Sequence, residues 1–375
     1  MTVWDSLVGQ PGAVSALTSA IEGASHAMTH AWLFTGPPGS GRSVAARSLA
    51  AGLQCTAGGC GQCKACVTVM NGVHPDVTVV RTERLSIGVN DVRNLVRSAS
   101  MSPALGRWQV IIIEDADRVT EQGAGALLKA IEEPAEKTVW MLCAPTQDDL
   151  MPTIRSRCRH VGLVTPSREA VATLLRGEGI PPAQAAFAAR VSQGHIGRAR
   201  AIATKPEVGE RRRQILALPA QLGNLGGCLE AAAWAVNTAQ TEATEATAEL
   251  DTQEKRQLSV ALGMEPGRSA PRGTAGQFKE LEDQQALRAK RFVRDQLDTV
   301  LLELTGYYRD VLVRQTSSVT DLINEDCLEA IDATARNSTP AATVRRLDAI
   351  VDCRTALNTN VAPLLAFEAL MVSLA

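Results

Sequence analysis

The sequence is poor in aromatic residues, carries almost no net charge and has no long apolar run. Phe, Trp and Tyr make up 3% of its 375 residues, too few for the stacking platforms of single-strand-binding proteins. Lys and Arg (38) nearly balance Asp and Glu (40), so the charge of the whole chain does not indicate nucleic-acid binding, although a local basic patch would. No stretch reaches the roughly 18 apolar residues of a membrane-spanning helix, and we expect no membrane partner.

The amino terminus and the cysteines both favour a cytoplasmic protein. Residues 1–5 lack the basic start and the apolar stretch of a signal peptide. The nine cysteines are an odd number, and four of them lie within residues 55–66. This pattern fits a reducing compartment and one metal site better than a disulfide framework. With 45% apolar residues, a chain of this length is expected to form two or three domains.

The first half of the chain alternates short β-branched runs with helical stretches, which predicts a parallel sheet covered by helices. Strands are expected at 31–35, 76–80, 108–113 and 139–143, and helices at 44–53 and, with Asn90 as N-cap, up to Ala99. From about residue 165 the strand signal ends. The spacing there predicts two short helices, at 169–176 and 182–191, and a helical chain from about 207 to 375.

One stretch interrupts this helical carboxy-terminal half. It is the Gly/Pro/Ser-rich segment 263–276, which follows a Thr/Glu/Ala-rich run from Thr238 to Glu249. Together they predict either a flexible excursion or a helix extension at 238–276.

A glycine-rich loop follows the first expected strand and opens a helix. Its residues are Gly36, Pro37, Pro38, Gly39, Ser40, Gly41, Arg42 and Ser43. They resemble the G-x-x-x-x-G-K-[ST] pattern, in which backbone N–H groups and a helix N-terminus bind phosphate. Arg42 replaces the usual Lys and brings a bulkier, planar group, whereas Ser43 keeps the hydroxyl that contacts Mg²⁺. We predict a nucleotide-shaped pocket with impaired or absent hydrolysis; a glycine-rich turn without ligand is the alternative.

Carboxylates end the most apolar strand. Glu114 and Asp115 follow Val110–Ile113, where P-loop NTPases place one Asp towards Mg²⁺ and a second carboxylate that orients water. The usual order is Asp then Glu. Its reversal changes the length of the side chain at each position by about one methylene, which is enough to misplace either carboxylate. The strand therefore predicts a second degenerate catalytic element, with a solvated strand end as the alternative.

Four cysteines lie just after the helix that the loop opens. Cys55, Cys60, Cys63 and Cys66 form C-x₄-C-x₂-C-x₂-C, with intervening glycines that permit tight turns. Four thiolates at this spacing match a closed, tetrahedral Zn²⁺ site, and a full set of protein ligands leaves no position for water. We therefore expect structural zinc; an iron–sulfur cluster and unligated thiols are the alternatives.

Taken together, these residues resemble the clamp-loader subunits of bacterial DNA polymerase III, an AAA+ assembly, and among them the delta-prime subunits. The resemblance rests on the phosphate loop, the cysteine cluster and further segments over roughly the first 200 residues. These further segments are Val8-Gly9-Gln10, His30 to Phe34, His74-Pro75-Asp76, Ala126 to Pro134 and Ser156-Arg157-Cys158. The last 170 residues or so carry only helical character.

The resemblance implies a fold of three domains. They are an AAA+ α/β P-loop domain over 1–165 with a zinc-binding insertion at 55–66, a small helical lid over 166–206, and an all-α oligomerisation collar over 207–375. It also implies a hetero-oligomer with gamma/tau and delta subunits that acts with the sliding clamp and primer-template DNA, within a DNA-directed DNA polymerase holoenzyme.

The resemblance places Arg157 at the position of an arginine finger. Such a residue projects across a subunit interface and neutralises charge on ATP bound by the neighbour. A plain surface or salt-bridging Arg is the alternative.

Two further elements depart from the active motors of this family. Those motors sense the γ-phosphate with a Thr pair, whereas this chain has Ala144-Pro145 there, unless Thr146 substitutes. In the lid turn Gly194-His195-Ile196-Gly197-Arg198, the sensor Arg198 is shifted by one position.

These departures favour a stator without its own hydrolysis that donates Arg157 to a neighbouring ATPase. Its pocket would be empty or would hold ATP and Mg²⁺ structurally. The alternative is an ATP-hydrolysing motor of the gamma/tau kind that uses Arg42 in place of Lys. A zinc-stabilised nucleic-acid-binding module is a third hypothesis, which the near-neutral charge disfavours.

Overall fold

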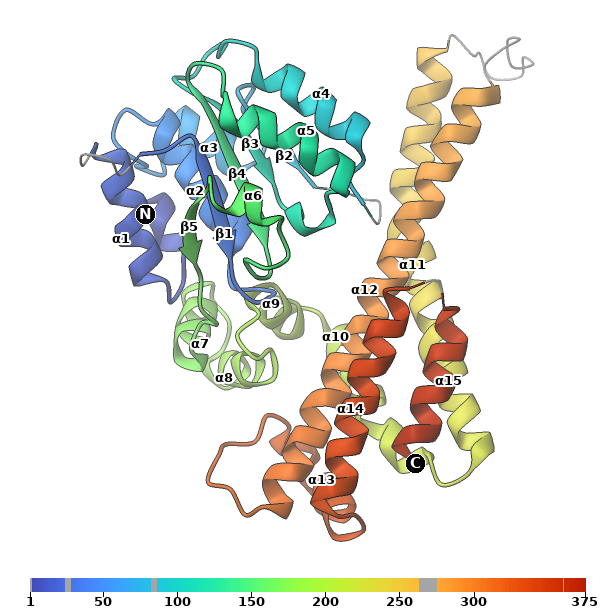
Figure 1. Ribbon diagram of the computed structural model, residues 1–375. Helices are drawn as coiled ribbons and strands as arrows, with labels where there is room; N and C mark the ends of the chain where they lie inside the picture. The colour runs from blue at the N-terminus through green and yellow to red at the C-terminus, as the bar shows by residue number, and fades with distance from the viewer. Residues whose placement is uncertain (1, 24–27, 82–85, 263–274, 360) are drawn as a thin grey trace. The chain divides into compact units, whose positions relative to one another are not determined.

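A computed structural model of the protein describes residues 2–23, 28–81, 86–262, 275–359 and 361–375 (Figure 1). The chain forms two compact units, Met1–Thr204 and Lys205–Ala375. Within the described residues, no helix is both long enough and apolar enough to cross a membrane.

The first unit is built on a sheet of five parallel strands in the order β2-β3-β4-β1-β5. The strands are β1 (Ala31–Thr35), β2 (Val77–Val80), β3 (Gln109–Ile113), β4 (Thr138–Ala144) and β5 (Arg159–Gly162). Every residue of β1, β3 and β4 is buried, as expected for strands covered on both faces. These three strands and β2 confirm the strands expected from sequence, to within one residue at each end.

The fifth strand, β5, was not expected from the sequence. Its residues read Arg-His-Val-Gly, and only Val161 is buried, because β5 is an edge strand that pairs with β1 alone. A strand that buries one side chain carries no apolar run to reveal it.

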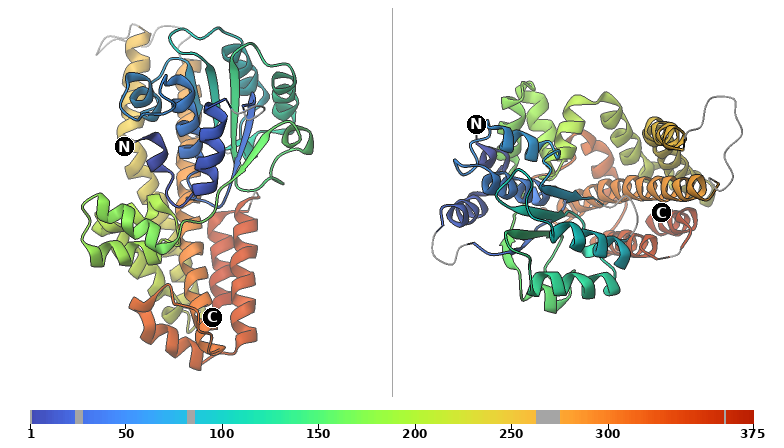
Figure 2. Two further views of the ribbon diagram at one scale, coloured as in Figure 1. Left: turned by 90° about the vertical axis from the view of Figure 1, so that its left-hand side faces the viewer. Right: turned by 90° about the horizontal axis from the view of Figure 1, so that it is seen from above.

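Helices cover both faces of the sheet (Figures 1 and 2). One face packs against α1 (Pro11–Ile21), α2 (Arg42–Gln54) and α3 (Lys64–Met70), and the other against α4 (Val89–Ala99), α5 (Glu121–Glu132) and α6 (Pro152–Arg155). The alternation along β3 and β4 divides the core: Ile112 and Met141 face the first set, whereas Ile111 and Trp140 face the second. Two 3₁₀ turns, η1 (Val3–Ser6) and η2 (Ala116–Arg118), complete this part.

The expected N-cap of α4 was wrong. The cap is Gly88 rather than Asn90, because Asp91 in the first turn accepts the Gly88 N–H at 3.1 Å and stabilises an earlier start. Three short helices end the unit: α7 (Arg168–Gly177), α8 (Pro182–Val191) and α9 (Ile196–Thr204). The first two lie where the sequence predicted them, and Ser167 caps α7 through the Ala170 N–H.

All regular secondary structure in the described residues of the second unit is helical. It consists of α10 (Pro206–Ala217), η3 (Leu218–Gln221), α11 (Leu225–Ala261), α12 (Ala275–Gln315), η4 (Glu325–Cys327), α13 (Leu328–Arg336), α14 (Pro340–Leu357) and α15 (Pro363–Leu374). One apolar core joins them, centred on Tyr307, Tyr308 and Phe367. The two tyrosine rings meet edge to face with centroids 5.3 Å apart.

The longest helices, α11 and α12, lie side by side (Figure 1). Arg288 of α12 donates to Asp251 and Glu254 of α11, which fixes their register. For segment 238–276 the sequence predicted either a flexible excursion or a helix extension. Residues 238–261 belong to α11, so the second alternative describes this part of the segment. Residues 263–274 of that segment lie outside the described residues.

Candidate functional site

The phosphate-type loop connects β1 to α2 as the sequence predicted. Gly36, Gly39 and Gly41 have φ values of 154°, 81° and 96°, a backbone that residues with a side chain rarely adopt. Gly36 also packs tightly, because a Cβ there would lie 2.6 Å from the Ser40 Oγ and 2.7 Å from the Leu163 carbonyl oxygen. The loop therefore delivers the chain to the N-terminus of a 13-residue helix, where unpaired N–H groups favour an anion.

Arg42 begins α2 and lies among the groups at the strand ends. Its charge acts on Asp117 and on Cys143 of β4. Burial raises the pKa of Cys143 to about 12, so this thiol stays neutral. The Nη1 of Arg42 is buried and has no hydrogen-bond partner among the described residues. A buried guanidinium N–H in this condition favours an acceptor.

Glu114, at the end of β3, is held by two arginines. Arg47 of α2 donates Nη2 to Oε1, and Arg81, just after β2, donates Nε to Oε2, each at 2.8 Å. The Glu114 side chain is only 5% exposed. Both carboxylate oxygens are thus engaged by cations, and a metal ion or a water molecule at Glu114 would have to displace one of them.

Neither arginine was singled out in the sequence. The register that pairs Val80 with Ile113 puts Arg81 beside Glu114, and the Glu114 N–H donates to the Val80 carbonyl. The proximity of Arg81 to Glu114 could therefore have been inferred from the sequence, because neighbouring parallel strands end at the same edge of the sheet. Asp115 follows as the N-cap residue of η2 and is half-buried.

The turn before α9 covers the tip of the phosphate-type loop. A Cβ on Gly39 would lie 2.6 Å from the Cα of His195, so the two backbones are in direct contact. Arg198, which the sequence placed in this turn, is the third residue of α9, and its backbone N–H donates to the Nδ1 of His195 at 3.2 Å. Burial, and then the charge of Arg198, lower the pKa of His195, so the imidazole stays neutral near pH 7. The loop, the acidic strand end and the helical turn thus converge.

The contact between Gly39 and His195 predicts that two substitutions in the loop lower the free energy of unfolding by different amounts. Gly39→Ala should destabilise the first unit by about 3 kcal/mol or more, because a positive φ and a collision with His195 add together. Gly41→Ala should cost only about 1–2 kcal/mol, since its φ is similar but no atom lies within 4 Å of the added Cβ. Denaturant unfolding of both variants measures the difference, and equal costs would contradict the contact.

In the loop that follows β4, neither Pro145 nor Thr146 offers a free hydroxyl. Pro145 gives its carbonyl to the Gly36 N–H, and both the N–H and the Oγ1 of Thr146 donate to Asp149 Oδ2, at 2.7 and 2.8 Å. Thr146 is therefore engaged away from the phosphate-type loop.

Arg157 lies apart from this convergence, in the turn between α6 and β5. Its Nη2 pairs with Glu132 Oε1 at 2.6 Å, and its Nη1 donates to the Thr153 carbonyl at 2.9 Å. The side chain is 41% exposed. Arg155, two residues earlier, pairs with Asp148 instead.

The four cysteines come together just after α2. Their Sγ atoms all lie within 4.8 Å of one another, and Cys55 lies 3.7 Å from both Cys60 and Cys63. A tetrahedral zinc with Zn–S bonds of about 2.3 Å needs sulfur atoms about 3.8 Å apart, so the cluster fits that ion. Backbone N–H groups of Ala57, Cys63 and Cys66 donate to cluster sulfurs.

These N–H donors favour the thiolates of Cys55 and Cys60, whereas burial raises the pKa of Cys66. Although burial acts against it, donors on Cys60, Gly59 and Ala57 lower the pKa of Cys55 to about 6. The glycines of the cluster also tie it to the amino terminus, where the Val3 N–H bonds Gly59 and the Trp4 Nε1 bonds Gly58. The cluster is thus part of the packing of the first unit.

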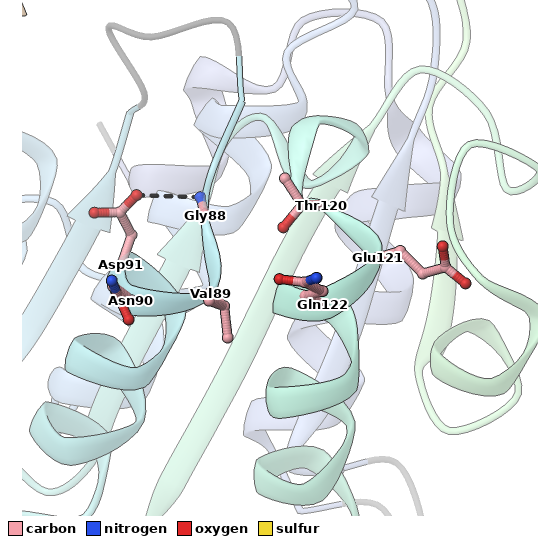
Figure 3. Close-up of a pocket in the computed structure, with 7 residues that line it drawn as sticks. All are labelled: Gly88, Val89, Asn90, Asp91, Thr120, Glu121 and Gln122. Carbon is pink, nitrogen blue, oxygen red and sulfur yellow. Dashed lines mark hydrogen bonds between the residues drawn. The ribbon is translucent and has the colours of Figure 1, made fainter.

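An open pocket of about 610 Å³ lies between the amino-terminal turns of α4 and α5 (Figure 3). Gly88 to Asp91 line one side and Thr120 to Gln122 the other. Further along the same two helices, a second groove is lined by Arg93, Arg97 and Lys129, with no acid among its lining residues. Arg93 and Arg97 lie one turn apart on α4 and Lys129 lies on α5, so this basic patch forms only where the two helices pack together.

Asp76, from the His74-Pro75-Asp76 motif, organises the loop before β3. Its carboxylate accepts the N–H groups of Ala104, Leu105 and Gly106 at 2.5–2.9 Å. Burial opposes ionisation, but these donors and the nearby His74 hold the pKa of Asp76 below its usual value. The motif therefore has a folding role.

Asp76→Ala should destabilise the protein by about 3 kcal/mol at pH 7, because three backbone N–H groups lose a charged acceptor whose side chain is buried. Since the pKa is lower in the folded state, this stabilisation is complete above about pH 4 and is lost as the pH falls further. The free energy of unfolding, measured with urea, should therefore differ more between Asp76→Ala and the unsubstituted protein at pH 7 than at pH 3. Asp352→Asn, at an exposed carboxylate, is the control; a pH-independent difference would contradict the role of ionised Asp76.

A parallel sheet with a glycine-rich loop between β1 and α2 defines a P-loop-type α/β domain. Residues 9–167 match the model of a family described as DNA polymerase III, delta subunit. Over 159 residues the chain is 36% identical to the DNA polymerase III subunit gamma/tau of Mycobacterium tuberculosis, covering 41% of this chain and 27% of that protein. Over 135 residues it is 41% identical to the subunit delta′ of Pseudomonas aeruginosa, covering 34% and 41%.

Residues 9–167 thus match this family model and are similar in sequence to delta′ and gamma/tau subunits of DNA polymerase III. The matched segment spans less than half of the length of either relative. Among solved structures, a DNA polymerase III gamma subunit-related protein of Thermotoga maritima aligns over 92% of this chain and 99% of its own, with 17% identity and a TM-score of 0.36.

Proposed function

We propose that the protein is a clamp-loader subunit that does not hydrolyse ATP itself and that donates Arg157 to a neighbouring ATPase subunit. In this function it serves as a stator during loading of the sliding clamp onto primed DNA. The proposed layout is an AAA+ domain (1–165), a lid (166–206) and a collar (207–375) that joins gamma/tau and delta subunits in a hetero-oligomer.

The observation that carries the absence of hydrolysis is the pairing of Glu114 with Arg47 and Arg81. Hydrolysis needs a carboxylate at this strand end that is available to a metal ion or to water. Removing Arg47 from the buried Glu114 carboxylate would add to the barrier, whereas the bond to Arg81, whose side chain is 68% exposed, is weakened by solvent. The contact of His195 with Gly39 and the replacement of Lys by Arg42 act in the same direction.

The exposure of Arg157 supports its role in a partner's site. A guanidinium that is 41% exposed is within reach of another subunit, and it is always charged. Placed against the γ-phosphate of a neighbour's ATP, it would stabilise charge that develops in the transition state.

Zinc, in this proposal, is structural. The sulfur separations of the cluster fit a closed tetrahedral site, and its backbone bonds to η1 make it part of the fold. Residues Cys55, Cys60, Cys63 and Cys66 would supply all four ligands, which leaves no position for catalysis.

Contact with DNA, if made by this subunit within the complex, fits the groove that Arg93, Arg97 and Lys129 line. Cations on a groove favour phosphates without base specificity.

The alternative is a motor of the gamma/tau kind. The unpartnered Nη1 of Arg42, buried at the helix N-terminus, favours it, because a phosphate oxygen would satisfy that group. ATP turnover of the reconstituted loader, with Arg157→Ala compared with Arg42→Ala, decides between the two. Turnover that depends on Arg42 supports the motor, and turnover that depends on Arg157 supports the stator.

A further inference from the structure

The guanidinium of Arg157 is anchored to the same chain on one side. It lies over the carboxyl end of α5, where Glu132 accepts Nη2 at 2.6 Å. On the α6 side, Nη1 donates to the Thr153 carbonyl at 2.9 Å and to the Ser156 hydroxyl at 3.3 Å. Three contacts from two helices therefore define where this side chain points.

Two sources of negative charge meet at this place. The last carbonyls of α5 carry the negative end of the helix dipole, and the Glu132 carboxylate adds a full charge. His30 bonds the Ile131 carbonyl at 2.8 Å, and the Glu132 carboxylate is the acceptor that pairs with Arg157. Its neighbour Glu133 is also exposed but is the C-cap residue, beyond the last helical position.

The other two arginines near this turn have partners of their own in the described part of the chain. Arg155, the nearest arginine in sequence, is paired with Asp148 at 2.5 Å. Arg159, two residues further, lies over the Trp32 ring, 5.1 Å from its centroid. Arg157 is thus the arginine of this turn that Glu132 holds.

A contribution to stability does not account for the pair. Glu132 is 39% exposed and Arg157 41%, and half-exposed ion pairs add little to folding. What such a pair changes is the freedom of a long side chain, which otherwise samples many rotamers.

We propose that Glu132 is a positioning residue for Arg157: it holds the guanidinium at the surface so that its exposed edge meets the phosphate of a neighbouring subunit's nucleotide. This inference rests on the proposed role of Arg157 in trans. The carboxylate acts through the arginine and touches no nucleotide itself.

The test uses the loader reconstituted with all its subunits, with DNA- and clamp-stimulated ATP turnover as the readout. Glu132→Gln, which keeps the shape but removes the charge, should lower kcat by about three- to tenfold and leave KM for ATP unchanged, because freed rotamers make the arginine less often available. Glu132→Asp, which restores the charge one methylene shorter, should recover part of the loss. Glu133→Gln, on the adjacent exposed carboxylate, is the matched control and should behave as the unsubstituted protein.

A double substitution separates positioning from other effects. In the Arg157→Ala background, Glu132→Gln should cause no further loss, since its effect passes through the arginine. An additional loss there, or faster turnover by Glu132→Gln alone, would overturn the inference. Normal turnover by Glu132→Gln with loss by Arg157→Ala overturns the inference alone, whereas normal turnover by Arg157→Ala overturns the proposed function itself.

Discussion

Arg157→Ala is expected to lower ATP turnover at the neighbouring site that it serves by about a thousandfold or more. Arginine fingers contribute about 10³–10⁵ to kcat, because they neutralise charge that develops on the transferred phosphoryl group. Other ATPase sites in a hetero-oligomer would keep their own fingers, so the loss is clearest in single-turnover measurements on the loader reconstituted with DNA and clamp. The side chain contributes little to folding, and the thermal midpoint of the isolated subunit should not change.

Arg42→Ala is the companion measurement. Under the stator hypothesis it leaves turnover unchanged, because Glu114 remains bound by Arg47 and Arg81 and no hydrolysis occurs on this chain. Loss of turnover with Arg42→Ala and not with Arg157→Ala would reverse the assignment and make this chain a motor.

Replacing any one of the four cluster cysteines with Ser should abolish stoichiometric zinc and destabilise the first unit by at least about 3 kcal/mol. Structural zinc contributes about 10–16 kcal/mol of binding free energy in small zinc domains, and this binding is coupled to folding. Here the loss would also release Val3 and Trp4, which bond to the glycines of the cluster. Metal analysis of the purified protein and denaturant unfolding measure the two effects.

Cys327→Ser is the control for this series, since Cys327 lies in the second unit and outside the cluster. Zinc retained at one equivalent in all four cluster variants would contradict a four-cysteine site. Iron in place of zinc would select the iron–sulfur alternative that the spacing left open.

Local patterns predicted much of this fold. β1, β3 and β4 are buried at every position because both faces of the sheet are covered, and each is an apolar run with one polar residue at its end. The cysteine spacing encodes a cluster within a dozen residues. Such features depend on neighbours in sequence, so one sequence suffices to find them. β5 shows the limit, since an edge strand with one buried residue has no pattern of its own.

Contacts between distant residues could not be predicted in the same way. Arg47 lies 67 residues from Glu114, and His195 is far in sequence from Gly39. The sequence identified Glu114 and Arg157 as candidates but not the partners that determine their charge environment. Those partners follow only from the order and register of the strands and from the packing of the helices.

The pairing of α11 with α12 has a mechanical consequence. Beyond Ala239, the last residue of α11 in the core cluster, the helix continues for 22 residues, about 33 Å. In this part, Arg288 and Gln285 of α12 form hydrogen bonds with Asp251 of α11. Because these bonds join the two helices, the pair behaves as one rod rather than as two separate helices. A tilt of about 10° at the core would carry the far end through about 6 Å. The pair is therefore a lever arm, which converts a small rotation within the helical unit into a large displacement.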